Sequence, residues 1–210
     1  MTITEAVKDF MSSSQNLPDG RYKSWEYCFD FFSHKFDKQN WDYAALMLGF
    51  YLASWGMYRG SSFLLQYTYT LHIGALKIIF SNRYASLQHK RNLDKEDVGL
   101  LFQLIQELKR YYFEKNKAYS SINSYSQVSD TLVSKILMGV LGNIPAYDRY
   151  VKEGLKQIKI SQTMSEKGYL QLLEFYYKNK VEIDNLGKEC PKYTPMKLID
   201  MYLWNLRQKS

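Results

Sequence analysis

The chain has 210 residues, which is enough for one sizeable hydrophobic core, and we expect a single domain over residues 1–210. Apolar residues make up 46% and charged residues 23%, a composition that excludes a disordered chain, and no uninterrupted run of about eighteen apolar residues indicates a membrane span. The net charge of +7 and an aromatic content of 16% favour nucleic-acid binding, because phosphates attract cations and bases stack on rings. The alternative is that tyrosines line the rim of a helical core while lysines maintain solubility.

The start of the sequence carries no basic stretch leading into an apolar run, so we expect no signal peptide. The two cysteines, Cys28 and Cys190, lie far apart and indicate no disulfide framework. These features predict a cytoplasmic protein that does not insert into a membrane.

Helical spacing of apolar residues continues along the whole chain. Ser24 is a candidate cap for a helix that carries aromatic residues at three- and four-residue spacings, and Asn40 is a candidate cap for the next helix. Thr163 with Glu166 predicts a capping box, and Thr194 before a proline predicts another helix start. The predicted helices cover about residues 2–12, 24–36, 40–57, 62–87, 98–116, 129–141, 148–158, 163–186 and 195–208, and residues 68–70 are a candidate interruption of the helix at 62–87.

Residues 43–57 are apolar on nearly every side, so we expect them to form the central and most buried helix. Residues 117–128 are the one stretch with loop composition. The sequence therefore predicts an all-α, compact bundle of eight or nine helices, with a boundary between two lobes near 117–128. A cleft between such lobes is where a ligand would bind.

No metal or cofactor site is predicted. The histidines His34, His72 and His89 are scattered, the cysteines are single, and no phosphate-binding glycine loop occurs.

Residues 59–62 form a candidate phosphate site. Gly60 allows a ligand to approach the backbone closely, and Ser61 and Ser62 at a helix start would leave free N–H groups beside Arg59. The alternative is a turn between helices with a serine cap.

The most specific feature is the segment TLVSKILMGVLGNIPAYDRYV at residues 131–151. It predicts a helix bearing Lys135, a stop at Gly142, and Pro145 leading to Asp148 at the next helix start. An aspartate at a helix start is held ionised by backbone N–H groups and the helix dipole. Such a carboxylate can stabilise a developing positive charge, or it can simply cap its helix.

This segment resembles the helix–hairpin–helix DNA glycosylase superfamily, in particular its 8-oxoguanine glycosylase-like branch. There a Ser/Thr-Lys pair opens an apolar helix and a Pro-x-x-Asp segment delivers the catalytic aspartate, which would correspond to Ser134-Lys135 and to Pro145 through Asp148. The segment MKLIDMYLW at 196–204 resembles the Leu-Asp-x-x-Leu-Trp ending of some glycosylase-like proteins. Unlike that family, residues 126–130 hold no glycine, and the spacing from the lysine to the aspartate is shorter.

The resemblance implies a DNA glycosylase-like protein that acts on a flipped modified or damaged base, with Lys135 as nucleophile and Asp148 stabilising the cationic sugar. The alternative is a non-enzymatic helical module that binds nucleic acid or a protein partner, as a regulator or defence component does. The two hypotheses differ in geometry, because only the enzyme requires Lys135 and Asp148 to face one concave pocket.

Overall fold

A computed structural model describes residues 1–12, 17, 19–88, 90–119 and 128–206. These residues are helical, turn or irregular, which confirms the all-α class, and no described helix is long and apolar enough to cross a membrane. The α-helices are α1 (Ile3–Ser12), α2 (Lys23–Asp30), α3 (Trp41–Ser54), α4 (His72–Ile79), α5 (Ala85–Gln88), α6 (Asp97–Tyr119), α7 (Asp130–Val140), α8 (Arg149–Gln157), α9 (Glu166–Lys178), α10 (Lys180–Glu189) and α11 (Pro195–Leu206). Short elements between them are the π-helix η2 (Phe31–Lys35) and the 3₁₀ helices η3 (Phe63–Gln66), η4 (Tyr69–Leu71) and η5 (Asn82–Tyr84).

The described residues therefore form eleven α-helices, and the expectation of eight or nine was wrong. The predicted helix at 62–87 is divided into η3, η4, α4, η5 and the start of α5. Extended backbone at Tyr67 and Thr68 agrees with the candidate interruption near 68–70, whereas the other breaks were not predicted. The predicted helix at 163–186 is interrupted at Asn179, where α9 ends and α10 begins. Neither proline nor glycine occupies that position, so the sequence carries no obvious signal for the break.

The predicted helix starts can be compared with the observed caps. Asn40 accepts from Tyr43 N at 3.1 Å and Thr194 Oγ1 accepts from Lys197 N at 3.1 Å, so both of these predictions are confirmed. The other two are wrong: α2 already begins at Lys23, before Ser24, and α9 is capped by Ser165 and not by Thr163.

The most buried helix is α7, and the prediction for residues 43–57 was wrong. Every residue from 132 to 140 is buried, because α7 packs against α2, α3 and α6. In α3, Leu46 is 43% exposed and Phe50 is 57% exposed, so these side chains form an apolar face open to solvent. A helix that is apolar all round gives no sign of which face its neighbours will cover.

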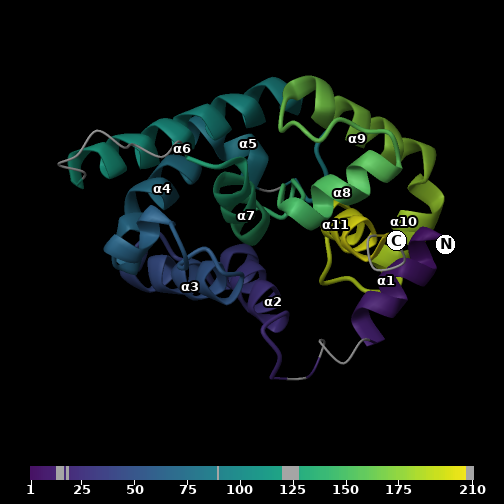
Figure 1. Ribbon diagram of the computed structural model, residues 1–210, viewed down its shortest axis with the longest axis horizontal. Coiled ribbons are helices and arrows are strands. Elements are labelled where there is room, and N and C mark those ends of the chain that lie inside the picture. The colour runs from purple at the N-terminus through teal and green to yellow at the C-terminus, as the bar shows by residue number, and fades with distance from the viewer. Residues whose placement is uncertain (13–16, 18, 89, 120–127, 207–210) are drawn as a thin grey trace.

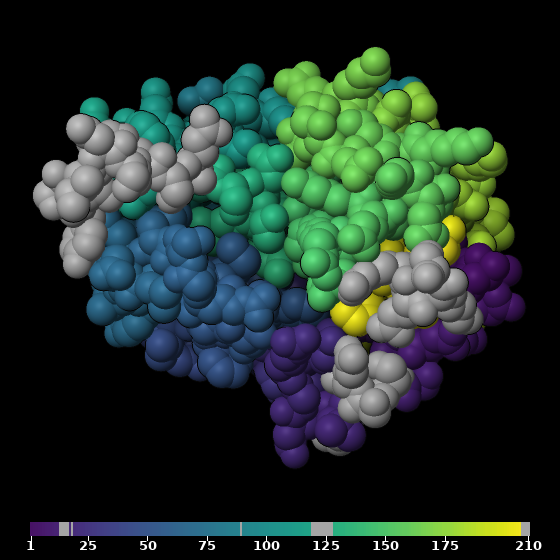
Figure 2. Space-filling model, in the orientation of Figure 1, coloured from purple at the N-terminus to yellow at the C-terminus, as the bar shows by residue number. Residues whose placement is uncertain are grey.

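Helix α7 lies near the middle of the molecule, with α3, α4 and α6 to its left in the view, α5 above it, α2 below it and α8–α11 to its right (Figure 1). The N-terminal helix α1 joins the second group, where it packs against α10 and α11. Asn205 Nδ2 in α11 donates to Ala6 O in α1 at 2.9 Å, and both residues are buried. In the space-filling view, the purple surface of α1 accordingly lies beside the yellow and yellow-green C-terminal helices (Figure 2).

The loop predicted at 117–128 lies mostly outside the described residues, which omit 120–127. Helix α6 continues to Tyr119, three residues beyond its predicted end.

Candidate functional site

Lys135 lies in the middle of the buried helix α7. Ser129 caps this helix by accepting from Leu132 N at 3.2 Å, and the packing of α7 against α2, α3 and α6 buries Lys135. Only 6% of the Lys135 side chain is exposed, and its Nζ donates to Trp55 O at the end of α3 at 3.3 Å. A lysine is rarely buried this deeply, and a buried ammonium group requires partners.

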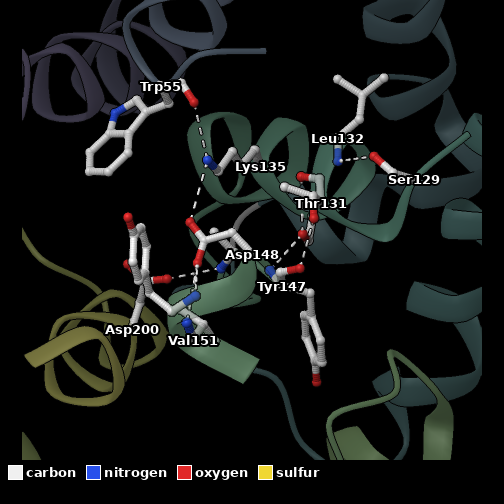
Figure 3. A network of polar contacts seen from close by, with 12 residues as sticks. Trp55, Ser129, Thr131, Leu132, Lys135, Tyr147, Asp148, Val151 and Asp200 are labelled. Atoms are coloured by element: carbon white, nitrogen blue, oxygen red, sulfur yellow. Dashed lines mark hydrogen bonds and ion pairs between the residues drawn. The ribbon is translucent and has the colours of Figure 1, made fainter. Parts of the chain in front are cut away.

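Asp148 caps α8 and faces Lys135 at the same time. Its Oδ1 accepts from Tyr150 N at 3.0 Å and from Val151 N at 3.1 Å. Its Oδ2 lies 3.4 Å from Lys135 Nζ (Figure 3). The predicted position at the helix start is thereby confirmed. One carboxylate oxygen is committed to the helix and the other to the ion pair.

The backbone just before Asp148 is held by the first turns of α7. Ser134 Oγ accepts from Tyr147 N at 2.8 Å and donates to Asp130 O at 2.7 Å, while Thr131 Oγ1 donates to Tyr147 O at 2.9 Å. The Tyr147 side chain points away from the ion pair (Figure 3). Ser134 thus fixes the path of the chain into Asp148, a role that the sequence pattern alone did not reveal.

A second ion pair from α11 adjoins the first. Lys197 Nζ lies 2.8 Å from Asp200 Oδ2, and both side chains are almost fully buried. Asp200 Oδ1 accepts from Ala146 N at 2.9 Å, so α11 holds the segment that leads to Asp148. The segments at 131–151 and 196–204, which were singled out separately in the sequence, therefore meet at one place.

Trp55 lies close to both lysines. Lys135 Nζ lies 5.4 Å and Lys197 Nζ 5.7 Å from the centroid of its indole ring, within the range of cation–π attraction. Lys197 Nζ also lies 5.1 Å from the centroid of Trp25. The Trp55 indole N–H is buried without a hydrogen-bond partner among the described residues. Most buried polar groups in proteins have a hydrogen-bond partner, and Trp55 shares this exception with Ser24, Asn92, Asn143 and Tyr147.

The environment of Lys135 lowers its pKa. Burial is the main cause, because it disfavours the charged ammonium form, and the nearby Lys197 acts in the same direction. Asp148 and Asp200 oppose this effect without cancelling it. The neutral amine, which is the nucleophilic form of lysine, is therefore easier to reach at Lys135 than in free lysine.

The two ion pairs and four aromatic rings enclose a small cavity of about 10 Å³. Such a volume corresponds to roughly one water molecule and is far too small for a nucleobase. Lys135 and Asp148 thus face one pocket, but a larger ligand could enter only if its walls moved apart. The lining residues are Phe10, Tyr51, Trp55, Lys135, Met138, Ala146, Asp148, Lys197, Asp200 and Trp204.

The candidate phosphate site at 59–62 lies in the turn that follows Trp55. Arg59 and Ser61 are exposed, and Gly60 has a left-handed backbone with φ of 60°. Ser62 N donates to Arg59 O and Ser62 Oγ accepts from Leu64 N, so Ser62 acts as a turn and cap residue. The element that it opens is the four-residue η3 and not an α-helix, and a phosphate-binding role remains a prediction.

Lys135 and Asp148 are predictable from the sequence, whereas no sequence pattern gave a role to Trp55, Lys197 or Asp200. The spacing of Lys197 and Asp200, three residues apart on one helix face, was the available signal for an ion pair. The position of Trp55 beside Lys135 depends on how α3 packs against α7, which no local pattern encodes.

Comparison of the chain with protein-family models, with curated proteins and with solved structures finds no match.

Proposed function

We propose that this protein is a DNA glycosylase-like enzyme that acts on a modified or damaged base flipped out of the duplex. The observation that carries the proposal is the pairing of Lys135 Nζ with Asp148 Oδ2 at 3.4 Å on the wall of one pocket. A depressed lysine pKa and a rigidly held carboxylate are what a glycosylase with lyase activity requires.

In the proposed reaction, the neutral amine of Lys135 attacks the C1′ carbon of the sugar. The C1′–N bond breaks, its electron pair leaves with the base, and the base takes up a proton. Asp148 stabilises positive charge on the sugar and lies close enough to Lys135 to accept the proton that the amine loses. Opening of the sugar ring then converts the adduct into an imine that links lysine to DNA.

The proposal requires the pocket to open, because a cavity of about 10 Å³ holds no base. Phe10 and Trp204 lie in edge contact at 5.4 Å and come from the two ends of the chain. Separation of α1 from α11 at these rings would widen the pocket beside Asp148 without breaking the Lys135 ion pair.

The test is borohydride trapping with duplexes that carry oxidised, alkylated or deaminated bases. Wild-type protein should form a covalent adduct with at least one duplex, and peptide mapping should locate it on Lys135. Lys135→Gln should abolish the adduct, whereas Lys156→Gln, at an exposed position of α8, should leave it unchanged. An adduct on an exposed lysine, or none on any duplex, would contradict the proposal.

The second candidate is a non-enzymatic helical module that binds nucleic acid or a protein partner. The observation that favours it is the exposed apolar face of α3, where Tyr43, Leu46 and Phe50 lie at helical spacing. Salt-sensitive DNA binding by a wild-type protein that excises no base and forms no adduct would favour this candidate over the enzyme.

A further inference from the structure

A larger cavity, of about 560 Å³, lies away from the Lys135 pocket and shares no lining residue with it. Its walls come from α2, η2 and the ends of α4 and α7. Further lining residues outside these elements are Phe36, Lys38, Gln88, Lys90, Arg91, Pro191 and Lys192. This volume falls in the range of roughly 300–1,000 Å³ that is typical of small-molecule sites.

One wall of this cavity is aromatic. Phe36 and Phe80 have ring centroids 4.6 Å apart, and Phe32 stacks on Phe80 at 5.9 Å with an interplanar angle of 23°. Phe36 and Phe80 are only partly buried, so part of their ring surface remains open. A planar ligand can stack on such rings whatever its hydrogen-bonding pattern.

Two cations at the cavity have no acidic partner among the described residues. Lys38 Nζ donates to Phe80 O at 3.0 Å, and Arg91 Nη2 donates to Pro191 O at 2.5 Å and to Tyr193 O at 3.1 Å. These carbonyl contacts orient both side chains without neutralising their charge. An arginine held in this way still has donors for a phosphate, which its planar fork fits well.

The remaining charged groups at the cavity are already compensated. Glu26 accepts from Lys192 at 2.7 Å and from Tyr193 Oη at 2.5 Å, and Asp30 is paired with Lys35. Lys90 is bound to Asp97 at 2.7 Å. The charge that remains for a ligand is therefore positive and belongs to Lys38 and Arg91.

We propose that this cavity binds a phosphorylated planar aromatic ligand of mononucleotide size. The ring stacks against Phe36 and Phe80, and the phosphate binds Lys38 and Arg91. The ligand is either a free nucleotide or one nucleotide of a single strand, since both present the same chemistry. This site does not depend on the function proposed for Lys135, because none of its residues lines that pocket.

The test is calorimetric titration of the full chain at low salt with adenosine monophosphate, adenosine and inorganic phosphate. The nucleotide should bind at least tenfold more tightly than either fragment. Lys38→Gln and Arg91→Gln should each weaken nucleotide binding by roughly tenfold or more, as expected for loss of a charged hydrogen bond. Arg83→Gln, which removes an arginine outside the cavity, should have no such effect.

Two further measurements separate ring stacking from phosphate binding, and a free nucleotide from a single strand. Phe36→Leu should weaken nucleotide binding and leave phosphate binding unchanged, and circular dichroism should verify that each variant is folded. A pentathymidylate that binds at least tenfold more tightly than thymidine monophosphate would identify a single strand as the source, whereas equal affinities would identify a free nucleotide. The proposal is overturned if neither nucleotide nor oligonucleotide binds saturably, or if folded Lys38→Gln and Arg91→Gln variants bind as the wild type does.

Discussion

His72 is a fully buried histidine held between two tyrosines. Its Nε2 lies 2.7 Å from Tyr58 Oη and its Nδ1 lies 2.8 Å from Tyr112 Oη. Neutral imidazole fits this arrangement because one ring nitrogen can donate while the other accepts. Burial lowers the pKa of His72 to about 4.

This pKa predicts a loss of stability in mild acid. The unfolded chain takes up a proton at His72 near pH 6.5, whereas the folded protein does so only near pH 4. The stability that neutral His72 contributes to the free energy of unfolding is therefore fully present above about pH 6.5. It decreases as the pH falls towards 4, by about 3 kcal/mol in total. Urea unfolding between pH 4 and 6.5 measures this free energy. It should depend less steeply on pH in His72→Gln than in the wild type. An unchanged slope in His72→Gln would contradict the prediction.

The Lys135–Asp148 pair predicts strong coupling between the two residues. Asp148→Asn should retain most of the capping of α8, but it leaves the buried ammonium of Lys135 without its nearest carboxylate. We expect a loss of about 3 kcal/mol in the free energy of unfolding at neutral pH. In a Lys135→Met background, Asp148→Asn should lower the free energy of unfolding by much less. A double-mutant cycle measures this difference. Additive effects of the two substitutions would mean that the ion pair does not form.

At the scale of elements, α8 and α11 approach so closely that only glycine fits between them. A Cβ atom at Gly154 would lie 2.3 Å from Leu203 O, which belongs to the backbone of α11. Gly154→Ala should therefore force the helices apart and lower the free energy of unfolding by about 1–3 kcal/mol. Gly187→Ala in α10, where a Cβ meets nothing within 4 Å, should instead stabilise the protein by about 0.5–1 kcal/mol. Chemical denaturation measures both changes. If Gly154→Ala and Gly187→Ala changed the free energy of unfolding equally, α8 and α11 would not be in this contact.

The helix starts that could be predicted from the sequence are local. Asn40, Asp148 and Thr194 each accept from a backbone N–H two or three residues ahead, so a short window contains all the relevant atoms. The exposure of α3 and the burial of α7 could not be predicted in this way. They depend on which helices pack against each face. In addition, the polar residues Ser134 and Lys135 make the sequence of α7 resemble that of a partly exposed helix, although both are buried.

The candidate site shows the same division between local and distant information. Lys135 and Asp148 were identified from one continuous segment, and their contact at 3.4 Å spans only the turn between two successive helices. The remaining walls come from α1, α3 and α11, which join the site only after the two ends of the chain have packed together. The volume of the cavity could therefore not be predicted from the sequence, because it depends on aromatic rings from all these elements.

At the scale of the whole molecule, the net charge of +7 predicts DNA binding that weakens with salt. Exposed positive charge attracts the phosphate backbone, and binding releases counterions from the DNA. Arg59 is a candidate contact because it is exposed and has no ion pair among the described residues. Arg83 provides a matched comparison because its guanidinium already has partners. Its Nη2 donates to Gln103 Oε1 at 3.0 Å, and its Nη1 lies 3.9 Å from Glu107 Oε2.

We therefore expect duplex DNA to bind at low salt and to lose at least tenfold in affinity when the salt concentration is raised fourfold, which about two phosphate contacts would produce. Fluorescence anisotropy over a salt series gives the slope of log affinity against log salt. Arg59→Gln should reduce the magnitude of this slope by about one, because one phosphate contact is lost, whereas Arg83→Gln should leave it nearly unchanged. The two variants have the same net charge, so any difference between them reports a specific contact. Equal slopes in both variants would remove Arg59 from the DNA surface, and absence of binding at low salt would remove DNA as a partner altogether.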